Sequence, residues 1–223
     1  MEITVEELNK LLDEQWKRGF EAGKVHTAKE TFVENGKLIA SGKLNGHAFV
    51  DLGLPSGTLW ATCNVGANSP EVFGDYFAWG ETKPKIEYIE ENYNYASNPE
   101  VLPANNDAAT INWGEGWRMP TREEFVELEC KCTCKWTELN GKEGCLFIGP
   151  NGNYIFLPAA QDRSGDSKSY SGTYGFYWTS SLNSDSQFSR SWLFDFDKEG
   201  YGMNSDEFRS EGLSVRPVCS AQI

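Results

Sequence analysis

The sequence lacks any apolar run long enough to cross a bilayer, has only two histidines, and carries fewer basic than acidic residues. A membrane-spanning helix needs about 20 consecutive apolar residues, so we expect no membrane insertion. The 20 Lys and Arg residues against 33 Asp and Glu give a formal net charge of −13. Because phosphates repel such a chain, we expect no nucleic-acid or anionic-membrane partner.

Catalytic motifs are missing as well. His26 and His47 lie near the N-terminal end, and there is no Ser-His-Asp arrangement, Gly-rich phosphate loop or zinc-protease motif. The hydroxyls of Thr179–Ser181 are expected to serve strand ends rather than act as nucleophiles. We therefore predict no enzyme activity and no cofactor.

Acidic residues gather near the C-terminus, at Asp195, Asp197, Glu199, Asp206 and Glu207. Their spacing matches no recognised calcium loop. We interpret them as a solvated acidic surface, with a calcium site as the alternative.

The six cysteines form no obvious disulfide framework. Cys130, Cys132 and Cys134 precede Trp136 at a spacing of two, which would place all four side chains on one face of a strand. Small buried residues on such a face are the preferred interpretation. Zinc bound together with Cys145 and a redox role are the alternatives.

The first 44 residues differ in character from the rest. Thr4 and Glu7 form a capping box ahead of apolar residues at helical spacing, which predicts a helix over about residues 5–22. Asn35-Gly36 lies between two short apolar runs and predicts a hairpin. We therefore divide the chain into an appendage, residues 1–44, and a ligand-binding domain, residues 45–223. The helix is expected to pack on the domain, with self-association as the alternative.

The domain contains many short aromatic stretches bounded by glycine, which are typical of strands. Two of them, Tyr174–Ser181 and Glu211–Val218, flank a polar segment, Leu182–Ser210, which we expect to be a loose insert. Its mixture of aromatic and small polar residues suits a recognition surface. Within it, Phe194 and Phe196 share one face and are assigned to the core. Arg118 and Arg216, inside apolar strands, are expected to form buried hydrogen-bonded pairs.

Several motifs together resemble the Fibrobacter major paralogous domain. The resemblance covers about residues 45–219. It rests on Asn45–His47, the segment Val50–Ala67, Gly74–Thr82, Gly116–Thr121, Gly149–Asn153, Phe156–Ala160, Tyr177–Ser181 and Ser214–Val218. Members resemble the C-type-lectin-like fold, in the branch shared with formylglycine-generating enzymes and with the variable proteins of diversity-generating retroelements. The resemblance implies an α+β domain with two helices and twisted antiparallel sheets, beside the N-terminal helix and hairpin.

In those variable proteins the C-terminal segment displays the residues that contact ligand, and adenine-rich codons are diversified. Residues reachable from such codons are therefore expected to bind ligand here, together with the aromatic Tyr174. They are Tyr174, Asn183, Ser184, Asp185, Phe188, Arg190, Asp195, Asp197, Tyr201, Asn204, Ser205, Asp206, Phe208 and Arg209. Six residues of the segment cannot be reached from such codons and should not be diversified: Gln187, Trp192, Lys198, Glu199, Met203 and Glu207.

The resemblance implies a receptor-binding protein of a phage or bacterium, whose ligand is a protein or glycan on a cell surface. An undiversified cell-surface adhesin or carbohydrate-binding module is the alternative. An oxidase of the formylglycine-generating type is disfavoured, because only Cys219 lies late in the chain. Since Met1–Glu7 does not read as a secretory signal, we expect a virion-associated or cytoplasmic protein, or a cell-surface one if a signal has been removed.

Overall fold

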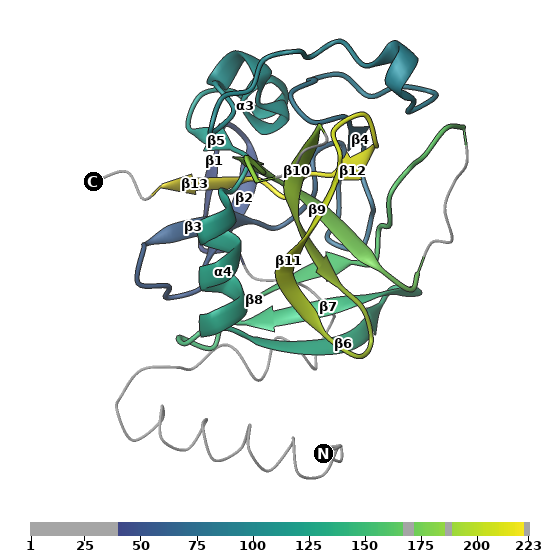
Figure 1. Cartoon of the computed structure of the whole chain (residues 1–223). Coiled ribbons are helices and arrows are strands. Elements are labelled where there is room, and N and C mark those ends of the chain that lie inside the picture. Colours follow the sequence, from purple (N-terminus) through teal and green to yellow (C-terminus); the bar gives the residue numbers. More distant parts are fainter. Residues whose placement is uncertain (1–39, 167–171, 186–188, 221–223) are drawn as a thin grey trace, which may run out of the picture. The chain divides into compact units, whose positions relative to one another are not determined.

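The chain divides into two units, Met1–Lys37 and Leu38–Ile223. The computed structural model describes residues 40–166, 172–185 and 189–220, all in the second unit (Figure 1). The helix and the Asn35-Gly36 hairpin expected near the N-terminus lie outside the described residues.

The first sheet joins the beginning of the domain to its end. Its order is β1-β2-β3-β13-β5, with the bounds β1 Gly42–Leu44, β2 His47–Asp51, β3 Thr58–Ala61, β5 Trp117–Arg118 and β13 Val218–Ser220. Asn45 and Gly46 connect β1 to β2 with φ of 48° and 85°, as a two-residue hairpin turn requires. Strand residues on both sides of the expected boundary at residue 44 therefore belong to one hairpin.

The second sheet carries the C-terminal half of the predicted recognition segment. Its order is β11-β10-β9-β12-β4, with the bounds β4 Tyr76–Phe77, β9 Gly175–Leu182, β10 Arg190–Phe196, β11 Tyr201–Phe208 and β12 Leu213–Ser214. The expectation of a loose insert is wrong, because β10 and β11 form an antiparallel hairpin. Phe194 and Phe196 are 0% and 1% exposed, which confirms their assignment to the core. Through these two rings, β10 packs against the interior of the domain.

The third sheet is an antiparallel meander of β6 (Thr133–Leu139), β7 (Lys142–Ile148) and β8 (Tyr154–Pro158). The predicted hairpin across the turn at 150–153 is confirmed by the pairing of β7 with β8. A second Asn-Gly pair, Asn140-Gly141, has positive φ at both residues and connects β6 to β7.

Helices are few in the described residues. They are α3 (Ala108–Trp113), α4 (Arg122–Lys131) and the short 3-10 turns η1 (Glu90–Asn92) and η2 (Ala104–Asn106). The capping box of Thr121 and Glu124 at the start of α4 is confirmed. None of these helices is both long and apolar enough to cross a membrane.

The fold class expected from the resemblance is wrong. Strand accounts for 39% of the structure and helix for 13%, and the sheets form a half-barrel rather than a two-helix α+β lectin domain. Only α4 among the described helices exceeds six residues. The physical reason is local: α3 stops after six residues at Gly114, whose φ of 89° does not continue a helix. The abundant aromatic residues instead supply strands.

The interior has two clusters of apolar side chains. In one, the ring of Phe125 on α4 stacks on Phe194 of β10 with centroids 4.7 Å apart. Arg216 is fully buried and its Nε donates to Asn64 Oδ1 at 2.8 Å. Its other donors meet backbone carbonyls, including that of Phe156 at 2.9 Å. The prediction of a buried, hydrogen-bonded arginine is confirmed at this position, with an amide and carbonyls as the acceptors.

The cysteine run does not lie on one strand, so that expectation is wrong. Helix α4 extends to Lys131, which leaves Cys130 exposed on the helix and Cys132 buried at its C-cap. Cys134 lies on β6 and forms a disulfide with Cys145 of the neighbouring β7. Within the described ranges no group of three His, Cys, Asp or Glu residues is suited to a metal ion.

Candidate ligand-binding surface

Four of the predicted ligand residues come together where β9 ends, β10 begins and β11 ends: Asn183, Arg190, Asp206 and Phe208. Arg190 and Phe208 are cross-strand partners, and Arg190 Cζ lies 4.0 Å from the centroid of the Phe208 ring. The Phe208 side chain remains 41% exposed. The hairpin therefore presents a planar cation and an aromatic ring together at the surface.

Asp206 holds this pair in place. Arg190 Nη1 donates to Asp206 Oδ1 at 2.9 Å and to its carbonyl oxygen at 3.1 Å. Asn183 Nδ2 donates to the other carboxylate oxygen, Oδ2, at 2.5 Å. Asn183 is itself buried, so it orients Asp206 rather than contacting a ligand directly. Side chains fixed in this way lose less entropy on binding.

Sequence reasoning missed two further members of this surface. Trp192 lies opposite Asp206 in the β10–β11 register and is half-buried. Arg122, the first residue of α4, places its Cζ 4.6 Å from the centre of the Trp192 ring. Strand alternation offers no signal for Trp192, because it shares its face with the core residues Phe194 and Phe196. We call the group the Arg–aromatic patch; it consists of Arg122, Asn183, Arg190, Trp192, Asp206 and Phe208.

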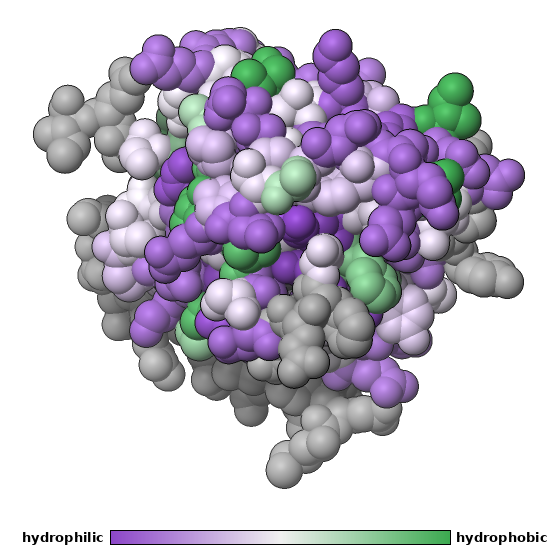
Figure 2. Space-filling model, turned by 45° about the horizontal axis from the view of Figure 1, so that its top comes forward, coloured by the Kyte–Doolittle hydropathy of each residue, from purple (hydrophilic) through white to green (hydrophobic). Residues whose placement is uncertain are grey.

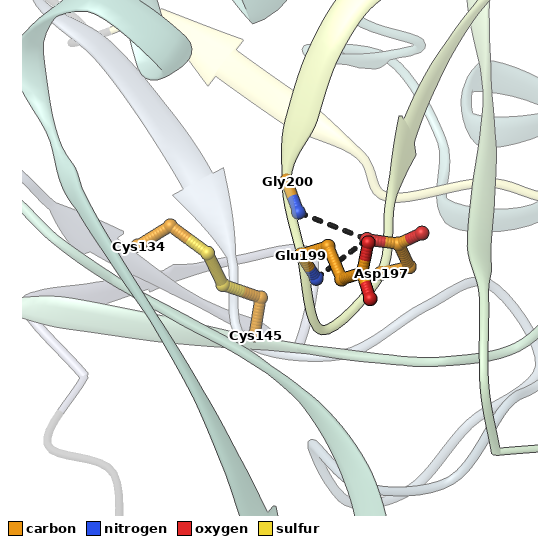
Figure 3. The surroundings of a disulfide bond; sticks show 5 residues. All are labelled: Cys134, Cys145, Asp197, Glu199 and Gly200. Carbon is orange, nitrogen blue, oxygen red and sulfur yellow. Dashed lines mark hydrogen bonds between the residues drawn. A yellow bond between two sulfur atoms is a disulfide. The ribbon is translucent and has the colours of Figure 1, made fainter. Parts of the chain in front are cut away.

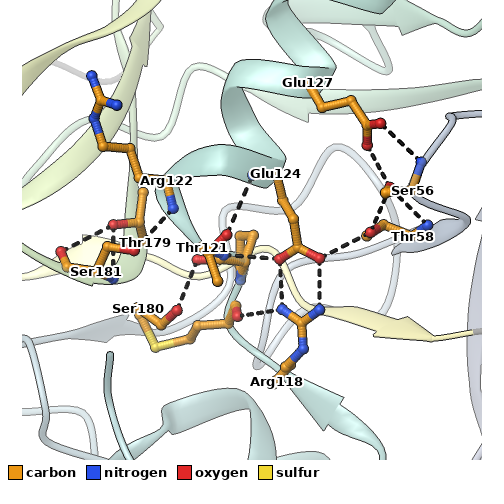
Figure 4. A network of polar contacts seen from close by, with 12 residues as sticks. Ser56, Thr58, Arg118, Thr121, Arg122, Glu124, Glu127, Thr179, Ser180 and Ser181 are labelled. Carbon is orange, nitrogen blue, oxygen red and sulfur yellow. Dashed lines mark hydrogen bonds and ion pairs between the residues drawn. The ribbon is translucent and has the colours of Figure 1, made fainter. Parts of the chain in front are cut away.

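A network of polar contacts fixes the start of α4 (Figure 4). The carboxylate of Glu124 accepts the Thr121 backbone N–H and a bidentate pair of bonds from Arg118, each of 2.6 Å. Burial alone would raise the pKa of Glu124, but the hydrogen bonds from Arg118 lower it overall. The Arg122 backbone N–H donates to Ser181 Oγ at 3.1 Å. The same contacts thus join α4 to β9, two residues before Asn183.

The guanidinium of Arg122 points away from that network (Figure 4). Among the described residues it has no hydrogen bond or ion pair, and its Nε is buried without an acceptor. Its guanidinium lies over the Trp192 ring. Arg122 is therefore a half-exposed cation without a paired anion.

The opposite end of the β10–β11 hairpin is built differently. Asp197 Oδ1 accepts the backbone N–H groups of Glu199 at 2.7 Å and Gly200 at 2.9 Å, which makes Asp197 a turn residue. Figure 3 shows this turn beside the Cys134–Cys145 disulfide. The predicted role of Asp197 in ligand binding thus gives way to a role in shaping the turn.

Tyr201 and Asp195 also lie toward this turn. The Tyr201 ring meets Phe147 of β7 edge to face at 5.7 Å and is 38% exposed. Burial raises the pKa of Asp195, while a hydrogen bond with Ser205 lowers it in part. Both predicted residues are held against neighbouring elements rather than joined to the Arg–aromatic patch.

The remaining predicted residues are dispersed. Tyr174 is 46% exposed and stacks on Phe176 with centroids 6.0 Å apart. Ser184 and Asp185 are exposed just after β9, and Ser205 is partly buried on β11. Phe188 and the side chain of Asn204 lie outside the described residues.

Arg209 is corrected from an exposed contact to an interior residue, with 5% exposure. Its Nη1 donates to the Ser97 carbonyl at 3.0 Å and to Asn98 Oδ1 at 2.9 Å. Its Cζ lies 5.4 Å from the Trp79 ring and 5.6 Å from the Tyr93 ring. Because β11 ends at Phe208, the next side chain turns inward and holds the loop that follows β4.

The hydroxyls of Thr179–Ser181 serve the fold, as predicted. Thr179 Oγ1 donates to the Trp192 carbonyl at 2.8 Å, and Ser180 Oγ donates to the Pro120 carbonyl at 3.2 Å. Elsewhere, burial raises the pKa of Glu211 to about 7, although Ser164 hydrogen-bonds to its carboxylate.

Figure 2 shows one face of the molecule, on which hydrophilic residues dominate and apolar side chains are scattered singly. Exposed apolar side chains of this kind are ordinary for a folded protein. This face is therefore mainly polar and shows no broad apolar patch.

One comparison with known proteins matches part of the chain. A protein-family profile described as a domain of unknown function, DUF8237, matches residues 151–218. The matched stretch runs from the β7–β8 turn to the beginning of β13 and includes every member of the Arg–aromatic patch except Arg122. No curated protein and no solved structure matches the chain.

Proposed function

We propose that the chain is a non-catalytic binding protein whose ligand contacts the Arg–aromatic patch. The observation that carries this proposal is the exposed Phe208 ring held against Arg190 at 4.0 Å on two paired strands. Trp, Tyr and Arg side chains on rigid elements are the residues that dominate binding energy at interfaces.

Three features support the patch over the rest of the predicted segment. It combines two arginines with two aromatic rings, and the hydrogen bonds that Arg190 donates to Asp206 fix one of those arginines. Asp197 and Tyr201, by contrast, contact the turn and β7. Ser184 and Asp185 are exposed at the end of β9, beside Asn183, and supply adaptable polar groups at the rim.

Receptor binding for a phage or bacterium, and diversification by a retroelement, are a further part of the proposal that rests on motif resemblance alone. The two-helix α+β lectin fold that this resemblance implied is not the fold of the domain, so the fold gives the proposal no support. A near-copy of the 3′ end of the gene beside a reverse transcriptase would support diversification. Its absence from the gene's surroundings would count against it.

Selection from displayed libraries tests the binding proposal. A random-sequence peptide library and a glycan array would be screened against the folded chain, and each hit measured on the variants Phe208→Ala, Arg190→Ala and Tyr174→Ala. The first two variants should weaken hits by about tenfold or more. Tyr174→Ala is the control, since Tyr174 is exposed but stacks on Phe176 away from the patch.

The thermal midpoint of each variant must stay close to that of the parent for the comparison to be valid. Hits that bind Phe208→Ala and Arg190→Ala as tightly as the parent would place the ligand elsewhere and overturn the proposal.

A further inference from the structure

We propose that the ligand is a protein segment that places a carboxylate side chain against Arg122. This inference rests on the proposed function and specifies the chemistry of the partner.

Arg122 occupies a position that does not favour a cation. It is the first residue of the ten-residue helix α4, where the positive end of the helix dipole repels positive charge. Its Nε is buried and has no acceptor in the part of the chain that the structure describes. A buried donor without a partner destabilises the free protein. An incoming carboxylate would offset the charge repulsion at the start of the helix.

Two other arginines near Arg122, Arg118 and Arg190, do have acceptors. Arg118 pairs with Glu124, and Arg190 pairs with Asp206. Glu207 also lies 3.8 Å from Arg190 Nη1. Glu124, Asp206 and Glu207 thus pair with other arginines, and Arg122 has no ion pair among the described residues.

A guanidinium has a planar fork of N–H donors that matches the two oxygens of a carboxylate. The Arg122 Cζ lies 4.6 Å from the centre of the Trp192 ring and its Nε is buried, so a carboxylate would bond the terminal N–H groups of the guanidinium. Because the chain as a whole carries a net charge of −13, the contact depends on local geometry rather than on long-range attraction.

The covered ring faces favour a protein over a glycan. A sugar ring stacks flat on an open aromatic face, but Arg122 lies over Trp192 and Arg190 lies over Phe208. Trp192 also packs against the interior cluster that contains Phe125. Phe208 remains 41% exposed beside the two guanidinium groups, a combination that suits the apolar and acidic side chains of a peptide.

The test uses a random-sequence peptide library displayed on yeast, sorted against the full chain. Enriched peptides should share an Asp or Glu at a fixed position. Replacing that residue by Asn or Gln, or Arg122 by Gln, should weaken binding by about tenfold. Arg122→Lys keeps the charge but loses the planar fork, so it should restore only part of the affinity.

Arg163→Gln is the matched control. Arg163 also stacks on an aromatic ring, 4.8 Å from the centre of Tyr76, but it lies outside the patch. It should leave peptide binding unchanged. The thermal midpoint of Arg122→Gln should stay within about 2 °C of the parent, because no folded-state acceptor is lost.

Two kinds of failure are distinguishable. Peptides that lose binding on Phe208→Ala but show no acidic preference and tolerate Arg122→Gln would overturn this inference and leave the proposed function standing. Peptides that tolerate both Phe208→Ala and Arg122→Gln would overturn both. A screen that yields only glycan ligands would overturn the choice of a protein partner.

Discussion

The two ends of the β10–β11 hairpin differ in what holds them. At the turn, Phe196 is 1% exposed and packs against Trp136 and Phe147 of the third sheet. At the open end, Phe208 is 41% exposed and contacts Arg190. One aromatic residue therefore fixes the hairpin to the domain, and the other is free to meet a ligand. The same residue type is buried at one end and, in our proposal, contacts the ligand at the other.

The largest expected effect is a difference in the free energy of unfolding between variants of those two phenylalanines. Phe196→Ala removes a buried ring and should lower the free energy of unfolding by about 3–5 kcal/mol. Phe208→Ala removes an exposed ring and should cost less than about 1 kcal/mol. Urea denaturation of both variants measures the difference, and equal losses would show that the open end is part of the core.

The disulfide should contribute next. Cys134 and Cys145 are separated by 11 residues, for which cross-linking is expected to stabilise the fold by about 2–3 kcal/mol. A reducing agent should lower the unfolding midpoint of the parent but not of a Cys134→Ser, Cys145→Ser variant. Since the bond lies near the turn, binding at the open end should persist below the lowered midpoint. Identical midpoints with and without reductant would show that the bond adds no stability.

Two arginines extend the comparison. Arg209→Ala removes a buried side chain that bonds Ser97 and Asn98, and should cost about 2 kcal/mol of stability. Arg190→Ala removes a half-exposed side chain and should cost about 0.5–1 kcal/mol. The order of the two unfolding free energies checks this, and a larger loss at Arg190 would reverse the assignment.

The smallest effect depends on pH. Burial raises the pKa of Glu211 from its ordinary value of 4.5 to about 7 in the folded protein. Because the folded state binds the proton more tightly, this contribution is fully present below pH 4.5 and is lost as pH rises through 7. The unfolding free energy of the parent should therefore fall relative to that of Glu211→Gln over this range. Parallel pH profiles would contradict the raised pKa.

Local sequence signals predicted local structure well. The capping box at Thr121 and Glu124, the turn at 150–153 and the core positions of Phe194 and Phe196 were all recognisable, because each depends on neighbouring residues. Asn45-Gly46 and Asn140-Gly141 carried the same hairpin signal and were overlooked.

Long-range features were less accessible. The fold class failed because sheet order depends on pairings such as β13 between β3 and β5, which span most of the domain. Arg209 was misplaced because its partners lie 111 and 112 residues away in the chain. Arg122 was missed because only the tertiary structure brings α4 to Trp192.

The central claim is that ligand binds at the open end of the hairpin. Its most direct test follows the indole N–H signals of the eight tryptophans by NMR while a library-selected binder is added to the full chain. Trp192→Phe identifies the Trp192 signal. That signal should shift most, whereas the signal of Trp79, which is fully buried and hydrogen-bonded to the Thr179 carbonyl at 2.9 Å, should stay in place. A bound ligand that leaves Trp192 unmoved and shifts other indoles would contradict the claim.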